Sequence, residues 1–321
     1  MPTVNDAVVR TKRLLHSNTR TELNNFLTTS GETNSIGTGT SLSLAHVTDG
    51  IRAGSYISVS DGSNLPETMY VRSSNGVSIQ VIRGVDGSAT IDWASTDVAT
   101  PATIEVEPRF TEHQILEAVR DAIRALPDNL YAVATTTASF STTEQAQAIT
   151  FSNGFNQVLS ATRTARSGED RLLGFNVKVQ EIPATSTDSG TSAAYKLIRQ
   201  ENIEKAVTVN LAYAHPFVTG TLTLGIDLVS TVGMSAEMTD IPALGAAASL
   251  VLGEESLRLD LHSQGDSRSD AAVAAGDRAR YSLVLQAQYD RRVSQEARRL
   301  MAKYGVRTGA AVWSVFPTTV R

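Results

Sequence analysis

The sequence predicts an α+β protein: a helical bundle with two inserted antiparallel β modules, a small β domain and a β-sandwich, and an extended C-terminal arm. Two observations predict this class. Four segments, at 3–30, 111–126, 240–258 and 270–304, place apolar residues at the three- and four-residue steps of amphipathic helices. The two long stretches between the first three are rich in Gly, Ser and Thr and alternate apolar with polar residues, as strands do. Because each helix has one apolar face, a single bundle can bury all four faces together.

The changes of pattern predict the domain boundaries. They divide the chain into an N-terminal bundle helix (1–30), a small β module (31–108), a second bundle helix (109–131), a β-sandwich module (132–235), the C-terminal bundle helices (236–305) and an extended arm (306–321). Each β module is therefore expected as an insertion between two helices of the bundle.

Length, charge and composition narrow the possible classes. The 321 residues carry 28 Lys and Arg against 33 Asp and Glu, so a generally basic coat for nucleic acid is not favoured. Without cysteine the chain has no disulfide, thiolate nucleophile or cysteine-ligated metal. No segment approaches the roughly 18–20 apolar residues of a membrane span. The first 15 residues also lack the features of a signal peptide. We therefore expect a soluble protein, made in the cytoplasm, with no membrane partner.

The first helix is expected to begin after Thr3, an N-cap residue, with Asp6 in the first turn where the helix dipole favours an acidic side chain. Polar residues around Asn18 weaken its middle, and it should end by 30–31. The small β module comes next, with five or six short strands. Four turn signals separate its strands, namely Asp49-Gly50, Asp61-Gly62, Asn75-Gly76 and Asp86-Gly87. Asn-Gly and Asp-Gly favour type I′ turns, in which both central residues have positive φ.

The second helix is expected to begin with a capping box formed by Thr111 and Gln114 and to stop at Pro127. The alternation after it predicts longer strands, which suggest a β-sandwich. The candidate strands are 148–151, 157–164, 173–179, 193–198, 207–213 and 221–229.

Two helices come after the sandwich. Asp240 is expected to cap the first of them, with Pro242 in its first turn and Gly253 marking a bend or an end. The second helix has the clearest pattern in the chain. Its apolar stripe comprises Tyr281, Leu285, Tyr289, Val293, Ala297, Leu300 and Tyr304, and Gly305 provides its C′ position.

Residues 57–108 resemble a β module that is common in virion proteins of tailed bacteriophages. The resemblance lies in Ser55–Val59, Glu67–Val71 and Val77–Val81, and in Val81–Ser88, which resembles the segment V-x-R-G-x-x-G-T of that module with Ser88 in place of Thr. The sequence Pro108-Arg109-Phe110-Thr111 before the second helix is similar to the segment that comes directly after the module in such proteins. The long Arg-rich helix and the extended tail further resemble head-to-tail connector (adaptor) proteins.

This resemblance implies a structural virion protein in the neck of the particle. Such a protein forms a ring of about twelve copies between the portal protein and tail or tail-terminator proteins. DNA passes through the channel of the ring without specific binding. Two alternatives remain: another tail, collar or baseplate component, and a carbohydrate-binding adhesin module, which the Ser/Thr-rich sandwich suggests.

The chain also lacks the common signatures of an enzyme. Its five histidines show no metal-ligand spacing, and there is no GxxxxGK[ST], strand-linked GxGxxG, GxSxG or HExxH motif. We therefore predict no enzymatic activity, no cofactor and no metal.

The candidate site residues are interface residues at the C-terminal end. Over 277–307 eight basic residues accompany three acidic ones. The predicted interface cations are Arg291, Arg292, Arg298, Arg299 and Lys303. These can dock on an acidic surface of a neighbouring ring, contact DNA phosphates, or form a solvated helix face. In the arm, Trp313 and Phe316 are predicted to anchor between subunits; the alternatives are docking on the parent bundle and a frayed end.

Overall fold

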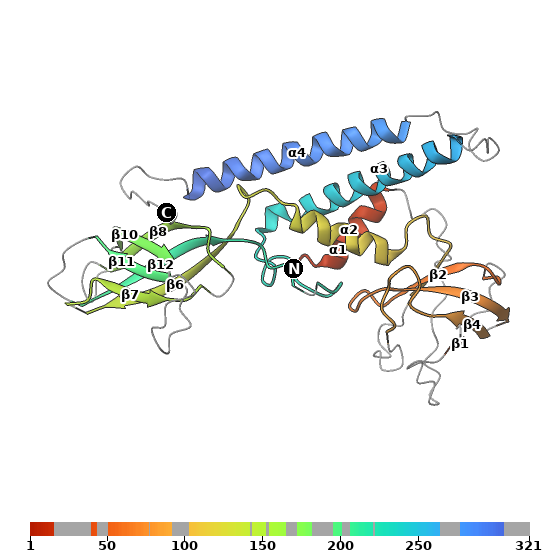
Figure 1. Ribbon diagram of the computed structural model, residues 1–321, viewed down its shortest axis with the longest axis horizontal. Coiled ribbons are helices and arrows are strands. Elements are labelled where there is room, and N and C mark those ends of the chain that lie inside the picture. The colour runs from red at the N-terminus through yellow and green to blue at the C-terminus, as the bar shows by residue number, and fades with distance from the viewer. Residues whose placement is uncertain are drawn as a thin grey trace, which may run out of the picture. The chain divides into compact units, whose positions relative to one another are not determined.

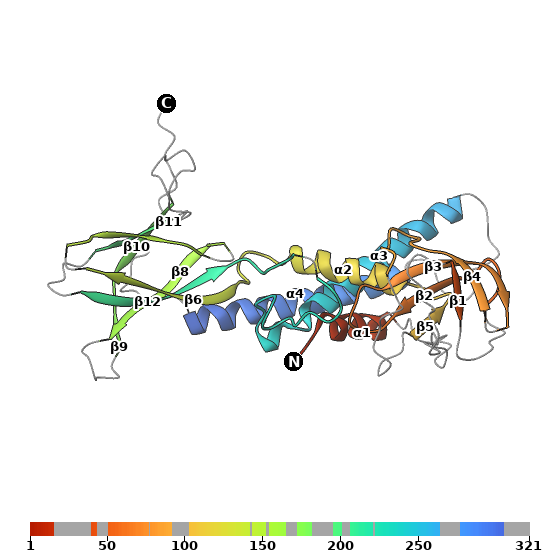
Figure 2. The same cartoon turned by 90° about the horizontal axis from the view of Figure 1, so that it is seen from below.

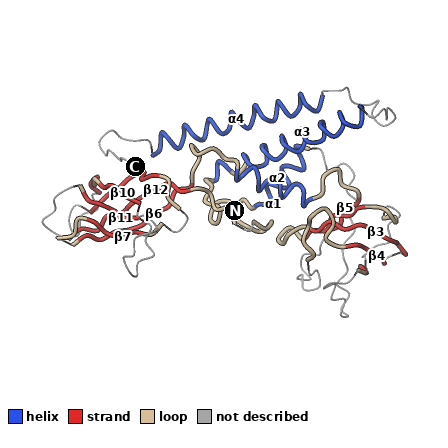
Figure 3. Tube along the Cα trace, in the orientation of Figure 1, coloured by secondary structure: helices blue, strands red, loops and turns tan. Residues whose placement is uncertain are grey.

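The computed structural model describes twelve ranges of the chain. These are residues 1–15, 40–43, 51–76, 78–91, 103–141, 143–151, 154–164, 172–181, 195–200, 206–220, 222–263 and 277–304. Within them the fold contains four α-helices and three antiparallel sheets, so the α+β prediction is confirmed (Figures 1 and 3). The chain forms two compact units. The first unit comprises residues 1–126 and 219–293, and the second comprises 127–218 and 294–321.

The helices are α1 (Val4–Leu14), α2 (Glu112–Arg124), α3 (Ile241–Ser263) and α4 (Asp277–Tyr304). The N-caps predicted at Thr3 and Thr111 are confirmed. The Thr3 hydroxyl accepts from the Asp6 N–H and the Asp6 carboxylate accepts from the Thr3 N–H, and Thr111 and Gln114 form the same reciprocal pair. Helix α3 continues through Gly253 to Ser263, so the bend or end predicted there is wrong. The part of the predicted first helix beyond Leu15 lies outside the described residues.

The predicted apolar stripe of α4 faces the protein. Leu285 and Leu300 are buried, and the other five stripe residues are half-buried. The N-terminal half of α4 packs in the first unit through polar contacts as well. The Tyr281 hydroxyl donates to the Leu14 carbonyl at 2.7 Å, and the Ser282 hydroxyl donates to the Ala248 carbonyl at 3.0 Å. Helix α3 also packs against α1 and α2. These three helices and the N-terminal part of α4 therefore belong to the first unit.

A glycine permits the close approach of three of these helices. A Cβ atom at Gly245 would lie 3.2 Å from the Ala122 Cβ of α2 and 3.2 Å from the Tyr289 ring of α4. We expect Gly245→Ala to lower the free energy of unfolding by about 1–3 kcal/mol, because the methyl group would lie closer to Ala122 and Tyr289 than ordinary van der Waals contact allows. Gly253, also in α3, has open space at its Cβ position. Gly253→Ala should instead raise the stability by about 0.5–1 kcal/mol. Urea unfolding followed by circular dichroism compares the two, and an equal response would contradict the close packing.

The β module of the first unit is a five-stranded sheet in the order β1-β4-β3-β2-β5. Its strands are β1 (Ser41–Ser43), β2 (Tyr56–Ser60), β3 (Glu67–Asn75), β4 (Ser78–Ile82) and β5 (Thr103–Val106). Alternate side chains of all five strands form one buried cluster that includes Ile57, Met69 and Ile79. The module therefore has a hydrophobic core of its own.

The predicted turns of this module have different outcomes. Asp86 and Gly87 both have positive φ (58° and 74°), and the Ser88 N–H donates to the Val85 carbonyl, which is the type I′ geometry. Asp61 and Asn75 have no positive φ, although Gly62 and Gly76 have, so the type I′ turns expected at Asp61-Gly62 and Asn75-Gly76 are wrong. Asp49-Gly50 lies outside the described residues.

The segment Val81–Ser88 is held by a buried ion pair and by a serine. The Glu67 carboxylate, which is fully buried, accepts from Arg83 at 2.6 and 2.9 Å, from the Gly84 N–H at 3.1 Å and from the Ile91 N–H at 3.0 Å. The Ser88 hydroxyl accepts from the Thr68 N–H at 2.9 Å. Arg83 and Ser88 of the motif thus each have a local structural role.

The second unit contains two antiparallel sheets. One has the order β6-β12-β8-β9 and the other β10-β11-β7 (Figure 2). The strands are β6 (Ala132–Phe140), β7 (Ala146–Ile149), β8 (Gln157–Thr164), β9 (Leu172–Gly174), β10 (Val177–Glu181), β11 (Tyr195–Arg199) and β12 (Val207–His215). One buried cluster draws on both sheets and includes Phe140, Phe175, Leu197 and Leu211.

Three strand predictions need correction. The structure has no strand over the described residues of 221–229: they form turns, with an isolated pairing of Thr3 with Asp227. Leu222, Leu224 and Leu228 are buried in the first unit instead. The strand predicted at 173–179 is two strands, because the chain leaves the first sheet at Gly174 and joins the second at Val177. Strand β6, which the alternation did not predict, is paired with β12 along its whole length.

Candidate interface on the C-terminal helix

The five candidate cations of α4 fall into two groups. Arg291, Arg298 and Lys303 are exposed. Within the described ranges, Arg291 and Arg298 have no ion-pair partner, and the Lys303 ammonium lies 5.1 Å from the ring centroid of Tyr304. Arg291 and Arg298 are seven residues apart and thus lie on one face of the helix. These three side chains are available to a partner.

The other two arginines hold the protein together. Arg292 forms a bidentate pair with Asp240, at 2.9 and 3.0 Å, and donates to the Glu237 carbonyl at 2.6 Å. Asp240 stands directly before α3, so this pair joins the N-terminal end of α3 to the middle of α4. Arg299 donates to Glu296 at 2.6 Å, and the Glu296 side chain is only 5% exposed. Arg292 and Arg299 each come directly after one of the exposed arginines, Arg291 and Arg298, but both are half-buried.

This difference can be measured. We expect Arg292→Ala to lower the free energy of unfolding by about 1.5–3 kcal/mol, because it removes charge-assisted hydrogen bonds and leaves Asp240 without its bidentate partner. The neighbouring Arg291→Ala should change the stability by less than about 0.5 kcal/mol. Thermal unfolding of both variants makes the comparison. Equal losses would contradict the assignment of Arg292 as structural and Arg291 as exposed.

Exposed apolar side chains share the helix with the exposed arginines. Leu283 is 69% exposed, Val284 52% and Met301 72%. Arginine and methionine are enriched in protein–protein interfaces, where apolar contacts and bidentate pairing occur together. The outward side of α4 therefore has the composition of a protein-binding surface. The predicted anchors Trp313 and Phe316 lie outside the described residues.

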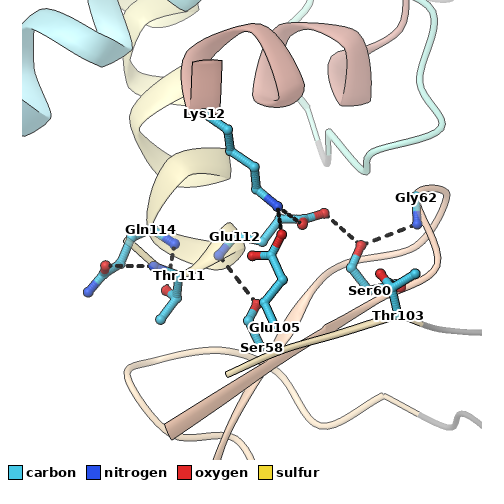
Figure 4. Close-up of polar contacts among 9 residues, drawn as sticks. All are labelled: Lys12, Ser58, Ser60, Gly62, Thr103, Glu105, Thr111, Glu112 and Gln114. Atoms are coloured by element: carbon cyan, nitrogen blue, oxygen red, sulfur yellow. Dashed lines mark hydrogen bonds and ion pairs between the residues drawn. The ribbon is translucent and has the colours of Figure 1, made fainter. Parts of the chain in front are cut away.

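A buried polar network that the sequence analysis missed joins the helices to the β module (Figure 4). The Lys12 ammonium of α1 donates to Glu112 of α2 at 2.5 Å and to Glu105 of β5 at 2.7 Å. The second oxygen of Glu112 accepts from the Ser60 hydroxyl at 2.6 Å. The Ser58 hydroxyl accepts from the Glu112 N–H at 3.3 Å. Its members are up to 100 residues apart in sequence, so no local pattern could have indicated it.

The network has a defined pH dependence. Burial opposes the charge of Lys12, but the attraction of Glu112 and Glu105 outweighs it, so the pKa of Lys12 lies above its ordinary value of 10.5. Its contribution to stability is complete below the unfolded-state pKa of about 10.4 and is lost as the pH rises through the higher folded-state pKa. We expect the unfolding midpoint to fall more steeply above about pH 10.5 in the parent protein than in Lys12→Met. Parallel slopes would contradict this.

A shallow groove lies on the outer face of the four-stranded sheet of the second unit. It is lined by Thr135, Thr136, Thr137 and Asn210. Neighbouring outward positions are also uncharged, since Ser139 faces Thr208 across the strands at 3.0 Å between hydroxyl oxygens. The groove offers hydroxyl and amide groups and no charged group.

The described ranges contain no metal-binding cluster, since no group of three or more His, Asp or Glu side chains is placed there to hold a metal ion. No helix within those ranges combines the length and apolar character needed to cross a membrane. In comparisons with known proteins, no protein-family model matches the sequence, and a search of the curated proteins gives no match.

Proposed function

We propose that this protein is a structural subunit of a tailed-bacteriophage virion: a head-to-tail connector that forms a ring around the DNA channel. About twelve copies form this ring in the neck of the particle. The portal protein and tail or tail-terminator proteins are its partners, and DNA passes without specific binding. The proposal includes a finer architecture: the helices form one bundle, the two sheets of the second unit form a β-sandwich, and residues 306–321 extend as an arm between subunits.

The observation that carries the proposal is the fold of the segment that resembles the phage module. It forms a separate five-stranded sheet with its own core, and it is inserted between α1 and α2. Arg83, Gly84 and Ser88, the motif residues, each bond to the start of β3. These bonds give the motif residues a structural role in the module. They support the resemblance more strongly than a similar composition alone would.

The charge distribution favours contact between copies or with an acidic neighbour. Residues 277–307 carry a net charge of +5 and the whole chain carries −5, so the remaining residues carry −10. Exposed arginines with apolar neighbours suit an acidic protein surface. They suit sliding DNA less, because a ring of phosphate-binding cations would retain the DNA.

The test is the symmetry of the protein in its native particle, determined by averaging of electron cryomicroscopy images. Twelve-fold density beneath the portal is the expected result. Three- or six-fold density lower in the tail would instead assign the protein to a tail, collar or baseplate role. Absence of the protein from purified particles would refute every virion role.

A charge reversal tests the proposed interface. Arg291→Glu with Arg298→Glu should abolish incorporation into particles while leaving the unfolding midpoint unchanged, since both side chains are exposed. Lys196→Glu, at a cation of β11 that is also exposed, is the control and should be incorporated normally. Equal incorporation of the two variants would remove α4 from the interface.

One observation favours a second candidate, a carbohydrate-binding adhesin module. The uncharged groove at Thr135–Thr137 and Asn210 presents the hydrogen-bonding groups that neutral sugars use. A glycan array tests this candidate, with Asn210→Lys as the variant expected to lose any binding at this groove. A blank array for the full chain would eliminate it.

A further inference from the structure

An aromatic cluster lies at one end of the core of the second unit. The rings of Phe151 and Phe155 stack with centroids 4.5 Å apart. Tyr213 lies 4.5 Å from Phe151, and Tyr195 lies 5.2 Å from Phe155. Phe151 and Tyr213 are buried, whereas Phe155 and Tyr195 are half-buried and keep part of their rings open to solvent. These two half-buried residues, Phe155 and Tyr195, form the aromatic edge of the cluster.

The last residues of α4, 294–304, belong to the unit that carries this cluster. The Tyr213 ring lies 5.9 Å from the His215 ring, and His215 pairs with Ala132 at the start of β6. Tyr131 precedes Ala132 in the chain. Burial and the nearby phenol of Tyr304 together raise the pKa of Tyr131. Tyr304, the last residue of α4, therefore belongs to the same compact unit as the cluster.

The sequence beyond Tyr304 suits this edge in length and chemistry. Residues 305–313, which lead to Trp313, can span at most about 30–32 Å, which exceeds the length of a few strand residues. Residues 305–321 include Trp313 and Phe316, and they carry Arg307 and Arg321 with no acidic residue. Glu181, which is exposed, pairs with Tyr195 across the strands and gives the edge a negative charge.

We propose that the edge formed by Phe155 and Tyr195 is the docking site of the chain's own C-terminal arm, with Trp313 packed on the open rings. An aromatic anchor of this kind buries a large apolar area with little loss of side-chain entropy. The short tether gives the arm a high effective concentration at the site. In the free chain, the aromatic side chain of Trp313 is thus covered. This inference concerns the free chain and does not depend on the proposed ring.

Trp313 provides the test, because the chain has two tryptophans and Trp93→Phe leaves it as the single emitter. Acrylamide quenching of this variant is compared with that of a synthetic peptide of residues 305–321. We expect the emission of the protein to be quenched several-fold less than that of the peptide. Adding Phe155→Ser and Tyr195→Ser should restore quenching at the level of the peptide. Tyr56→Ser, at an exposed aromatic residue of the other unit, is the control and should keep the protection.

Three results would overturn the proposal. Peptide-like quenching in Trp93→Phe would show that the arm is undocked. Protection that survives the double substitution would show docking elsewhere. Protection that appears only as the protein concentration rises would make a second copy the occupant. If circular dichroism shows that the double variant is unfolded, the exposed Glu181→Lys decides, because it should increase quenching at low salt and leave the core intact.

Discussion

Replacing Lys12 with methionine should lower the free energy of unfolding of the first unit by about 3–5 kcal/mol. The methionine leaves Glu105 and Glu112 side by side without a cation, with side chains only 17% and 8% exposed. Removing one partner of a buried ion pair lowers stability more than replacing the whole pair by apolar residues does, because the remaining charge stays buried and uncompensated. Denaturant unfolding monitored by circular dichroism gives the loss.

Two further variants test whether the loss of stability comes from the unpaired glutamates or from any substitution in α1. Arg13→Met, at an exposed cation of the same helix, should change the stability by less than about 0.5 kcal/mol. Lys12→Met combined with Glu105→Met and Glu112→Gln should recover most of the loss, because it removes both orphaned charges and keeps an amide for Ser60. A triple variant as unstable as Lys12→Met would show that packing at Lys12, and not charge, is responsible.

Arg83→Met should have an effect of similar size, about 3–5 kcal/mol, confined to the β module. Glu67 would keep the N–H groups of Gly84 and Ile91 but would lose its cation at full burial. Hydrogen exchange measures this region directly, and we expect the amides of β3 and β4 to lose protection before those of α2. Arg72→Met, at an exposed cation of β3, should leave the protection unchanged. Uniform loss of protection over the whole first unit would contradict an independent core for the module.

The elements that could be predicted from the sequence are those specified by neighbouring residues. Thr3 and Thr111 marked the two helix starts because a capping box needs only residues three apart. The α4 stripe was predictable from its period. The alternation of Leu222, Leu224 and Leu228 resembled a strand, but these side chains fill the first unit beside the N-terminal residues Thr3 and Val4, whose partners are more than 200 residues away. Strand β6 was missed because Ala and Thr supply little hydrophobic contrast along it.

The candidate interface was predictable only in part, for the same reason. The sequence identified a basic helix but could not tell which of its cations were free. Arg291 and Arg292 are identical in type and adjacent, and the angle of about 100° between them decides that one meets solvent and the other meets Asp240, 52 residues away. The Lys12 network could not be predicted from the sequence, because Lys12 lies on α1 and its partners lie on α2 and β5, about 100 residues away in the chain.

The first unit is made of two separate ranges of the chain, 1–126 and 219–293, so it can be completed only late in synthesis. Its α1 touches residues made much later: the Thr11 hydroxyl contacts the Ala243 carbonyl, 232 residues on, and Tyr281 bonds to Leu14. At about 5–20 residues per second, the ribosome needs about 12–46 s to supply α3 after α1 has emerged. The second unit, by contrast, has all its strands by residue 215. The packing of α1 against α3 and α4 is therefore still missing in the nascent chain when the sheets encoded after α1 are complete. Helix α1 thus leaves the ribosome well before α3 and α4 and reaches its final packing late, which exposes it to chaperones and to premature association with other nascent copies.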